Sequence, residues 1–593
     1  MSAMEYGHVS GLGPSDIEAR KKRKKLAIIA SSSILLVAMV VGVAVGISNH
    51  KASRSGSTSE SSSKGELHSS VKAVKALCSP TDFKDTCESA LTDAGGDTIT
   101  NPKELVKLAF NVTTDHIRRG LKNSTVLAEL EKDPRTSAAL RSCQELLDYA
   151  IDDLQNSLAQ FGDIDVSKVD DVIDDLRVWL SSAMTYHETC LDGFENTTGD
   201  AGEKMKAALK SSMELTTNAL AIIDDISAVL VAFKLPMFSR RLLSVDEETE
   251  LPAWVNTGRR RLLAATRVDL RPNVVVAKDG SGNFTTINEA LQVVPKKSNG
   301  TFVIHIKEGV YKENVMVSKS MLNVMMVGDG PTKTRITGNL NYIDGTPTFK
   351  TATLAVVGNG FIGKDLWIEN TAGPEKHQAV ALRVQSDMSV FYNCRMDGYQ
   401  DTLYCHTNRQ FYRECTITGT IDFIFGNSGA VFQNCQILVR KPLSNQQNIV
   451  TAQGRKGRRE PTAIIIHNST ITAEPKFFPY RNNTRTYLGR PWKEYSRTFF
   501  LQSYIDDLIH SDGWLPWSGD FGLKTCFYTE FDNRGPGATT TNRVAWRGVK
   551  KINYQHAQQF TVERFIQGNQ WVRATGVPYI PGLLPMSEDG RVH

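Results

Sequence analysis

The stretch FYNCRMDGYQDTLYCHTNRQFYRECTITGTIDFIFGNSGAVFQNC, residues 391–435, decides the fold. It contains three related segments, FYNC at 391–394, FYREC at 411–415 and VFQNC at 431–435, which recur every 20 to 21 positions. Short strands that repeat at this period without a long helix are typical of a parallel β-helix, in which each repeat forms one coil. A β-sandwich is the alternative, but its strands would not recur at a fixed period.

The strand pattern extends on both sides of this stretch. From residue 272 onward, short runs such as NVVVA, TFVIHIK and NVMMVGDG alternate with Gly and Asn, which favour turns. We therefore predict that residues 264–593 form one all-β domain, a parallel β-helix.

Residues 71–230 show a helical pattern instead. Leu140, Cys143, Leu147, Ile151 and Leu154 recur every three or four positions, and acidic residues fill the opposite face. Several amphipathic helices in about 160 residues indicate an antiparallel four-helix bundle. We find no set of ligand-type residues in this region.

The N-terminus carries an apolar segment. Residues 26–47 hold no charge and are long enough to span a bilayer, and six basic residues, Arg20 to Lys25, precede them. We expect a cytoplasmic tail (1–25), a transmembrane signal anchor (26–47) and a Ser-rich linker (48–70). A long cleaved signal peptide and a buried core helix are the alternatives.

The linker at 231–263 contains two copies of one motif, Arg240-Arg241-Leu-Leu and Arg260-Arg261-Leu-Leu. Paired arginines in an exposed linker are substrates for secretory-pathway processing proteases, so we predict cleavage there. A solvated run of charge is the alternative interpretation.

Composition narrows the class of protein. The 593 residues are 40% hydrophobic and 22% charged, which excludes a disordered chain, a collagen and a small disulfide knot. A multi-span membrane protein is also excluded, because only one stretch is apolar enough. Residues 65–235 carry 17 Lys or Arg and 29 Asp or Glu, whereas residues 264–593 carry 38 and 27. This contrast suggests docking between the two parts, or a polyanionic partner for the second.

Cysteines and sequons indicate an oxidising compartment. The nine cysteines include no C-x-x-C pair, so disulfides are favoured over a zinc site. Coiling would also bring Cys415 and Cys435, one period apart, within disulfide reach. Sequons for N-glycosylation occur at seven positions: Asn111, Asn123, Asn196, Asn283, Asn299, Asn468 and Asn482.

Polar residues recur at the same period. Gln378 precedes Gln400 by 22 residues, and Asp401 precedes Asp422 by 21. On successive coils, the two carboxylates would lie about 4.8 Å apart. Ionising both carboxylates at this distance would cost free energy through repulsion of like charges. One carboxylate should therefore stay protonated and the other should be charged. The two amides would supply donors for an oxyanion. The alternative is structural, since Asp often caps turns in β-helices.

Five motifs carry a family resemblance. The runs GVYKENV (309–315), QAVALR (378–383), YQDTLY (399–404), DFIFGN (422–427) and LGRPW (488–492) resemble the signature set of plant pectin methylesterases. Residues 71–230, with CSPTDFKDTC and TYHETCLDGF, resemble the inhibitor domain that is fused ahead of many such enzymes. The resemblance implies a right-handed parallel β-helix with carboxylic ester hydrolase activity on methyl-esterified pectin (homogalacturonan).

The resemblance also implies roles for individual residues. Asp422 would be the nucleophile, Asp401 the general acid and then the base, and Gln378 and Gln400 the oxyanion donors. Arg490 would bind Asp422, Trp492 would stack on a sugar ring and Thr348 would contact substrate. Without the resemblance, the favoured interpretations would be a structural ion pair for Arg490 and a core position for Trp492.

Further expectations follow from the same resemblance. Disulfides Cys78–Cys87 and Cys143–Cys190 would stabilise the bundle. The bundle would act as an intramolecular inhibitor. A third disulfide, Cys415–Cys435, would connect two coils of the β-helix. Cys405 would be a packing residue, and Cys394 and Cys526 remain unassigned. The family uses no metal or organic cofactor and binds no nucleic acid. A membrane-anchored precursor would pass through the secretory pathway and yield an enzyme of the cell wall.

Two other functions compete with this interpretation. An inverting glycosidase also uses paired carboxylates, but it needs roughly 6.5–9.5 Å between them, which exceeds one coil. Alternatively, the protein could act mainly as an inhibitor or wall-binding module with an inert β-helix. The complete set of Gln378, Gln400, Asp401, Asp422 and Arg490 argues against an inert β-helix.

Overall fold

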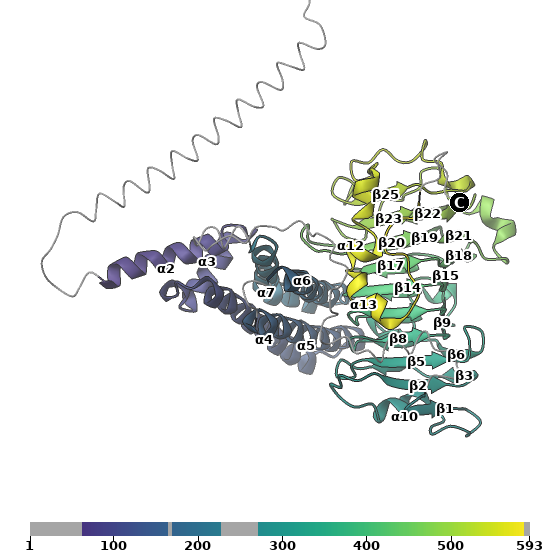
Figure 1. Cartoon of the computed structure of the whole chain (residues 1–593), viewed down its shortest axis with the longest axis horizontal. Helices are drawn as coiled ribbons and strands as arrows, with labels where there is room; N and C mark the ends of the chain where they lie inside the picture. The colour runs from purple at the N-terminus through teal and green to yellow at the C-terminus, as the bar shows by residue number, and fades with distance from the viewer. Residues whose placement is uncertain (1–61, 164–168, 227–270, 586–593) are drawn as a thin grey trace, which may run out of the picture. The chain divides into compact units, whose positions relative to one another are not determined.

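The C-terminal half of the chain winds through three parallel sheets, and each coil adds one strand to each of them (Figure 1). The computed structural model describes residues 62–163, 169–226 and 271–585. Every strand pair within these sheets is parallel, and neighbours within a sheet are three strands apart in the chain through most of the stack. This arrangement is a parallel β-helix, as the 20- to 21-residue period predicts; its right-handed winding stays a prediction.

The strands of the three sheets have the following bounds. The first sheet holds β1 (Val274–Val276), β2 (Phe302–Ile306), β5 (Val324–Gly328), β8 (Ile362–Lys364), β11 (Ser389–Tyr392), β14 (Arg409–Arg413), β17 (Gly429–Gln433), β20 (Ala463–His467), β23 (Arg497–Leu501) and β25 (Phe527–Phe531). The second holds β3 (Gly309–Lys312), β6 (Thr334–Gly338), β9 (Trp367–Asn370), β12 (Arg395–Asp397), β15 (Thr416–Gly419), β18 (Gln436–Val439), β21 (Thr470–Ala473) and β24 (Tyr504–Ile505). The third, here called the site sheet, holds β4 (Val315–Val317), β7 (Leu354–Val356), β10 (Leu382–Val384), β13 (Leu403–Cys405), β16 (Ile424–Gly426), β19 (Asn448–Gln453) and β22 (Thr486–Gly489).

The repeated sequence motif builds a column of stacked rings inside the coils. Phe391 pairs with Tyr412, and Tyr412 with Phe432, on three adjoining strands. Their ring centroids are 5.2 and 4.5 Å apart and the planes are nearly parallel. The next turn is left-handed in each coil, with φ of 50° at Asn393 and 56° at Asn434. Asn tolerates this backbone region better than most residues, which explains its place in two of the three coils; the coil between them has Glu414, with φ of 54°.

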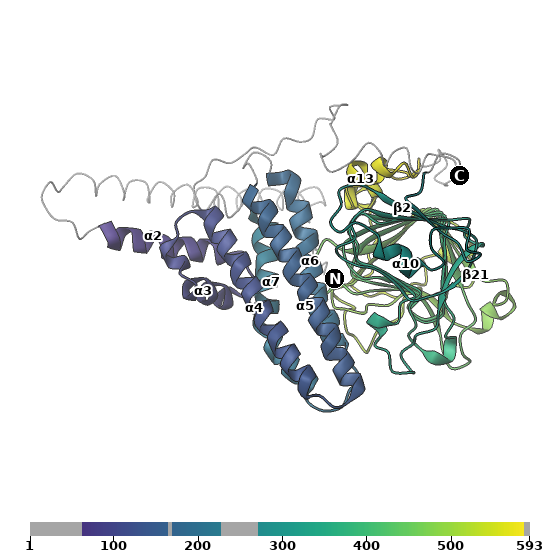
Figure 2. The same ribbon diagram turned by 90° about the horizontal axis from the view of Figure 1, so that it is seen from below.

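Short helices cover the ends and one face of the β-helix. The helix α10 (Ile287–Gln292) starts with a capping box between Thr286 and Glu289 and buries its apolar face in the core beside β1 (Figure 2). Three C-terminal helices, α11 (Tyr554–Gln558), α12 (Val562–Phe565) and α13 (Gly568–Thr575), pack against the outer face of the first sheet.

The N-terminal described region is helical. It contains α2 (Ser62–Cys78), α3 (Lys84–Asp93), α4 (Pro102–Leu130), α5 (Pro134–Asp163), α6 (Val169–Asp192) and α7 (Ala201–Asp224). The helix α4 starts with Asn101 as its cap and Pro102 in its first turn. It packs against α5 and α7, and α6 packs against the same two helices (Figure 2). We call residues 69–226 the helical part; they belong to the same compact unit as the β-helix.

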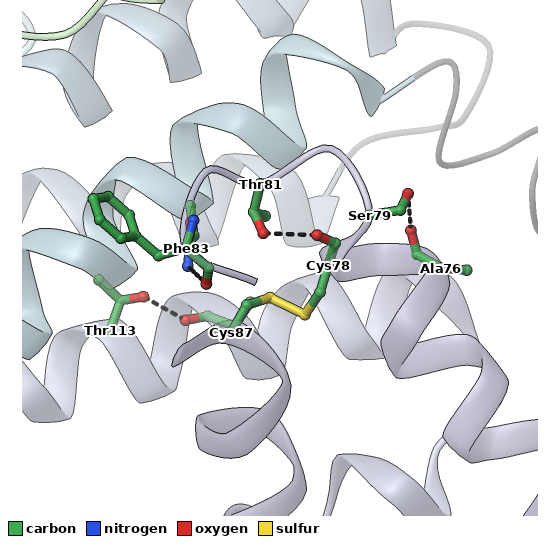
Figure 3. Close-up of a disulfide and its surroundings, with 9 residues drawn as sticks. Ala76, Cys78, Ser79, Thr81, Phe83, Cys87 and Thr113 are labelled. Carbon is green, nitrogen blue, oxygen red and sulfur yellow. Dashed lines mark hydrogen bonds between the residues drawn. A yellow bond between two sulfur atoms is a disulfide. The ribbon is translucent and has the colours of Figure 1, made fainter. Parts of the chain in front are cut away.

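Two disulfides lie in the helical part. Cys78 bonds to Cys87, and Cys143 bonds to Cys190, as the family resemblance implies. Figure 3 shows the first disulfide closing the short loop between α2 and α3, where the Thr81 hydroxyl donates to the Cys78 carbonyl at 2.6 Å.

The expected Cys415–Cys435 disulfide is not formed, so that prediction is wrong. Both residues are buried free thiols, as are Cys394, Cys405 and Cys526. Cys415 and Cys435 lie at matching positions of adjoining coils, because Thr416 pairs with Gln436. Side chains stacked in this register point the same way and keep the strand spacing of about 4.8 Å, which exceeds the usual Cβ separation of a disulfide. Cys405 is a core residue, as predicted, and its thiol lies 3.6 Å from the Tyr412 hydroxyl.

Several predicted features fall outside the described residues. They are the cytoplasmic tail, the anchor at 26–47, most of the linker at 48–70, and the processing motifs Arg240, Arg241, Arg260 and Arg261. None of the helices within the described ranges is both long enough and apolar enough to cross a bilayer.

Candidate active site

Asp401 and Asp422 lie at the same point of two adjoining coils. Each residue precedes a strand of the site sheet, and Leu403 pairs with Ile424 two residues later. The backbone N–H of Asp401 donates to the Ile421 carbonyl at 3.0 Å. Both aspartates have left-handed backbone angles, with φ of 62° and 51°. The two carboxylates are therefore one coil apart, which the 21-residue interval predicts.

Burial sets the charge of this pair. The side chains belong to residues that are 8% and 5% exposed. Burial, reinforced by the neighbouring Asp422 carboxylate, raises the pKa of Asp401 well above its usual value. Burial also raises the pKa of Asp422, but the Arg490 guanidinium opposes this shift. Of the two, Asp401 therefore keeps a proton more readily, and Asp422, bound by the arginine, ionises more readily.

Arg490 holds Asp422 through both carboxylate oxygens. Its Nε donates to Oδ1 at 2.8 Å and its Nη2 donates to Oδ2. The residue follows β22, and its backbone N–H donates to the Thr451 carbonyl. The guanidinium also lies 4.3 Å from the centre of the Trp517 ring. A bidentate arginine fixes both the orientation and the charge of the carboxylate.

Gln400 lies on the coil of Asp401, directly before it, and Gln378 lies on the preceding coil. The Gln400 carbonyl accepts a hydrogen bond from the N–H of Ala379, so Gln378 and Gln400 are neighbours across the coils. The side-chain oxygen of Gln378 is buried and makes no hydrogen bond to any residue in the described part of the chain. The protein does not satisfy this amide oxygen, which leaves it available to a ligand or water.

Three aromatic rings line the site, and we call Tyr404, Phe425 and Trp492 the aromatic wall. Tyr404 stacks on Phe425 at 4.2 Å, and Trp492 meets both rings edge-on at 6.5 and 6.0 Å. Tyr404 and Phe425 are not among the site residues predicted from the sequence, although they follow the same 21-residue interval as the aspartates. Trp517 is not among them either, and it has no periodic signal.

Thr348 begins a single 3-10 turn, Thr348–Lys350, that leads to the site sheet. Its carbonyl accepts from the Thr351 hydroxyl, which in turn accepts from the N–H of Val380 at 3.0 Å. Thr348 thus lies close to the coil of Gln378, as a contact in the same groove requires.

The helix α6 contacts the loops that follow the site strands. Thr189 hydrogen-bonds to His406 at 2.8 Å, and Asn427 donates to Thr185 at 2.8 Å. The Tyr186 ring lies 5.6 Å from the His406 ring. The aromatic wall belongs to the same hydrophobic cluster as the apolar core of the helical part.

Ion pairs join acidic residues of the helical part to basic residues of the β-helix. They include Asp82 with Arg458 and Arg459, Glu145 with Lys350, Asp153 with Lys319, Asp175 with Arg409, and Asp192 with Lys493. In every pair the helical part supplies the carboxylate. This pattern matches the charge contrast between the two parts of the sequence.

The predicted glycosylation sites differ in their exposure to solvent. Six sequon asparagines are exposed, and Asn468 is half-buried. In the described residues, no group of three His, Cys, Asp or Glu side chains is placed to hold a metal ion.

Comparison with known proteins agrees with this geometry. The pectinesterase family model matches residues 273–569, and the plant invertase/pectin methylesterase inhibitor model matches residues 72–222. A probable pectinesterase/pectinesterase inhibitor 21 of Arabidopsis thaliana is 51% identical over 98% of this chain and 85% of its own. Pectinesterase 1 of Citrus sinensis is 43% identical over 95% of this chain and 96% of its own. The solved pectin methylesterase from carrot is 50% identical with a TM-score of 0.53, covering 54% of this chain and 99% of its own. This chain therefore belongs to the pectinesterase family, with an inhibitor-family region ahead of the esterase.

Proposed function

We propose that this protein hydrolyses the methyl esters of homogalacturonan and releases methanol and free carboxylates. The observation that carries the proposal is the pairing, on adjoining coils, of Asp401, whose pKa is raised, with Asp422, which Arg490 binds through both oxygens. Membership of the pectinesterase family supports the choice of substrate.

The first step forms a covalent intermediate. A carboxylate oxygen of Asp422 attacks the ester carbonyl carbon, and Gln378 and Gln400 donate hydrogen bonds to the resulting oxyanion. The intermediate collapses as the bond to the methoxyl oxygen breaks. Asp401 gives its proton to that oxygen, so that methanol leaves.

The second step regenerates the enzyme. Asp401, now ionised, takes a proton from water as the water attacks the acyl carbon. Collapse of this second tetrahedral intermediate frees Asp422 and the galacturonate carboxyl group. Arg490 keeps Asp422 ionised and oriented throughout. Trp492 would stack on a sugar ring, and Thr348 would contact the neighbouring part of the substrate. All catalytic groups in this mechanism are side chains of the protein.

The helical part acts as an intramolecular inhibitor in this proposal. Its helix α6 contacts the loops of the site strands, and the aromatic wall is packed into its apolar cluster. A polysaccharide needs the same surface. Both disulfides would rigidify the helical part as a four-helix bundle.

Release of the enzyme would follow cleavage of the linker at Arg240-Arg241 or Arg260-Arg261. The apolar segment at 26–47 would direct the precursor into the secretory pathway and anchor it, and the mature enzyme would act in the cell wall. Glycans on the exposed sequons fit the same route.

A methanol-release assay tests the proposal. Residues 264–593 should release methanol from methylated pectin, and Asp422→Ala should abolish the release. New reducing ends without methanol would instead identify a glycosidase. Full-length protein should release methanol more slowly than residues 264–593; equal rates would refute the inhibitory role of the helical part.

A further inference from the structure

One loop of the β-helix is held by the helical part. Residues 339–347 connect β6 to the 3-10 turn that begins at Thr348, and Tyr342 lies within this loop. The backbone N–H of Tyr342 donates to the carbonyl of Gln378 at 2.9 Å. The loop is therefore tied to the coil that carries one of the proposed oxyanion donors, and it leads directly to Thr348.

The helical part contacts Tyr342 on three sides, and we call Arg135, Glu195, Asn196 and Tyr342 the tyrosine clasp. The Arg135 guanidinium lies 4.5 Å from the centre of the Tyr342 ring, and its Nη2 donates to the Tyr342 carbonyl at 3.3 Å. The Tyr342 hydroxyl donates to the Glu195 carbonyl at 3.3 Å, and Nδ2 of Asn196 donates to the same hydroxyl at 3.3 Å. All three hydrogen bonds are long, so the clasp is a weak contact that one added group can open.

Asn196 is also the acceptor residue of a sequon, Asn196-Thr197-Thr198. It is exposed, and it lies between α6 and α7 with a left-handed φ of 59°. A glycan bonds to Nδ2, the atom that donates to Tyr342, and replaces one of its two hydrogens. The first sugar ring is then attached at the edge of the tyrosine clasp.

The other two sequons of the helical part have a different position. Asn111 and Asn123 lie on α4, which packs against α5 and α7. A glycan on either residue is attached to another helix than the one that leads into the clasp.

The order of synthesis decides which partner reaches Asn196 first. Asn196 precedes Tyr342 by 146 residues, so it is translated before the β-helix can fold. A glycan added to the growing chain is therefore present when Tyr342 arrives. Asn468 differs, because its partner Asn434 precedes it in the chain.

We propose that a glycan on Asn196 loosens the hold of the helical part on the β-helix. The inference rests on the proposed esterase function and on its inhibition by the helical part. The bulky, hydrated sugar opens the tyrosine clasp and frees the loop at 339–347, which is tied to Gln378 and Thr348. The ion pairs between the two parts remain, so the glycan reduces inhibition and does not abolish it. The sequon thereby sets the activity of the uncleaved chain.

Substitutions of Thr198 test the proposal, because they change the sequon and leave the Asn196 side chain in place. Thr198 is exposed. Thr198→Ala prevents glycosylation of Asn196, whereas Thr198→Ser keeps the sequon. Thr125→Ala removes the sequon of Asn123 on α4 and is the control for the loss of a glycan elsewhere.

The full chain is secreted from a host that glycosylates proteins. Every version carries Arg240→Gln, Arg241→Gln, Arg260→Gln and Arg261→Gln, so that processing does not separate the two parts. Mass spectrometry of the version without further changes, the reference chain, should find a glycan on Asn196.

Methanol release from methylated pectin is the readout. Thr198→Ala should lower kcat/KM by about three- to tenfold relative to the reference chain, which corresponds to one hydrogen bond between the two parts. Thr198→Ser and Thr125→Ala should match the reference chain. Adding Tyr342→Phe to Thr198→Ala removes the hydroxyl that Glu195 and Asn196 bind, and it should restore the reference rate.

Three results would refute the proposal: an unmodified Asn196 in the reference chain, methanol release by Thr198→Ala that is as fast as or faster than the reference, or an equal loss in Thr125→Ala. Residues 264–593 serve as the uninhibited standard, because nearly the whole solved carrot chain is matched by about half of this one. Absence of methanol from this fragment would instead refute the esterase proposal. Equal rates for the fragment and the Thr198→Ala chain would refute inhibition by the helical part.

Discussion

Asp401 and Asp422 occupy equivalent left-handed turns of adjoining coils, and only Asp422 is held by an arginine. The same residue type therefore meets two environments. Asp401 is buried against a neighbouring negative charge, whereas Asp422 is buried against a positive one. The left-handed backbone costs free energy at a non-glycine residue, and the hydrogen-bonded coils on either side hold it in place.

The glutamine amides should matter for the transition state more than for binding. We expect Gln378→Ala and Gln400→Ala each to lower kcat by about 10²–10³-fold with little change in KM, because each loses a hydrogen bond to the oxyanion. Steady-state methanol release measures both constants. A rise in KM at constant kcat would instead assign these residues to ground-state binding.

Arg490→Gln should move the acidic limb of the pH–rate profile to higher pH. The arginine lowers the pKa of Asp422 against the effect of burial, so its removal lets that pKa rise. Asp422 would then become protonated, and inactive as a nucleophile, at a higher pH. Arg481→Gln is the matched control, because its ion pair with Asp507 is exposed and not part of the site. An unchanged acidic limb would show that Arg490 does not control the charge of Asp422.

Asp401→Asn should raise thermal stability while it abolishes activity. The pKa of Asp401 is higher in the folded protein than in the unfolded chain, so folding binds a proton. Its penalty on stability is absent below the unfolded pKa of about 3.9 and grows as the pH rises toward the folded pKa. A neutral amide removes the penalty, so the variant should melt a few degrees higher at pH 7 and show no gain at pH 3. Calorimetry at both pH values tests this, with the exposed Asp520→Asn as the control.

Asp175→Asn should weaken inhibition by the helical part. Asp175 binds Arg409 at 2.7 Å, and Arg409 keeps a second carboxylate, Asp387, within the β-helix. The β-helix should therefore fold normally while docking loses a buried ion pair. We expect methanol release by the full-length protein to rise several-fold. Asp174→Asn is the neighbouring control, since Asp174 pairs with Arg177 of the same helix; equal effects of the two variants would contradict the role of Asp175.

Glycans should be found on the exposed sequons and not on Asn468. The Nδ2 of Asn468, which a glycan would modify, donates to Asn434 Oδ1 at 2.7 Å in the ladder between coils. The residue is also half-buried. Mass spectrometry of peptides from the secreted protein tests this prediction. A glycan on Asn468 would mean that modification precedes the closure of these coils.

The sequence predicts the coils well because they are a local repeat. The interval between Phe391, Tyr412 and Phe432 is the length of one coil, and these rings stack on adjoining strands. The same interval places Asp422 beside Asp401. Strand pairing in a parallel stack leaves little choice of register, so matching positions in the sequence become neighbours in space.

Contacts that span loops of unequal length follow no sequence period. Arg490 reaches Asp422 from 68 residues away, and no fixed period connects the two positions, so only the family resemblance predicts the pair. The Trp517 ring beneath Arg490 gives no signal at all. The Cys415–Cys435 disulfide was predicted wrongly because a matching position gives proximity, whereas a disulfide also needs side chains that converge.

The site draws on five regions of one stack, from Thr348 through Gln378, Asp401 and Asp422 to Arg490. Lengthening the solenoid by a whole turn before Thr348 would leave these distances untouched, whereas one extra turn between Asp401 and Asp422 would part the carboxylates by a full rung. Coils can therefore be added or lost at the ends of the β-helix without changing the site. The coils from Thr348 to Arg490 must keep their number and order.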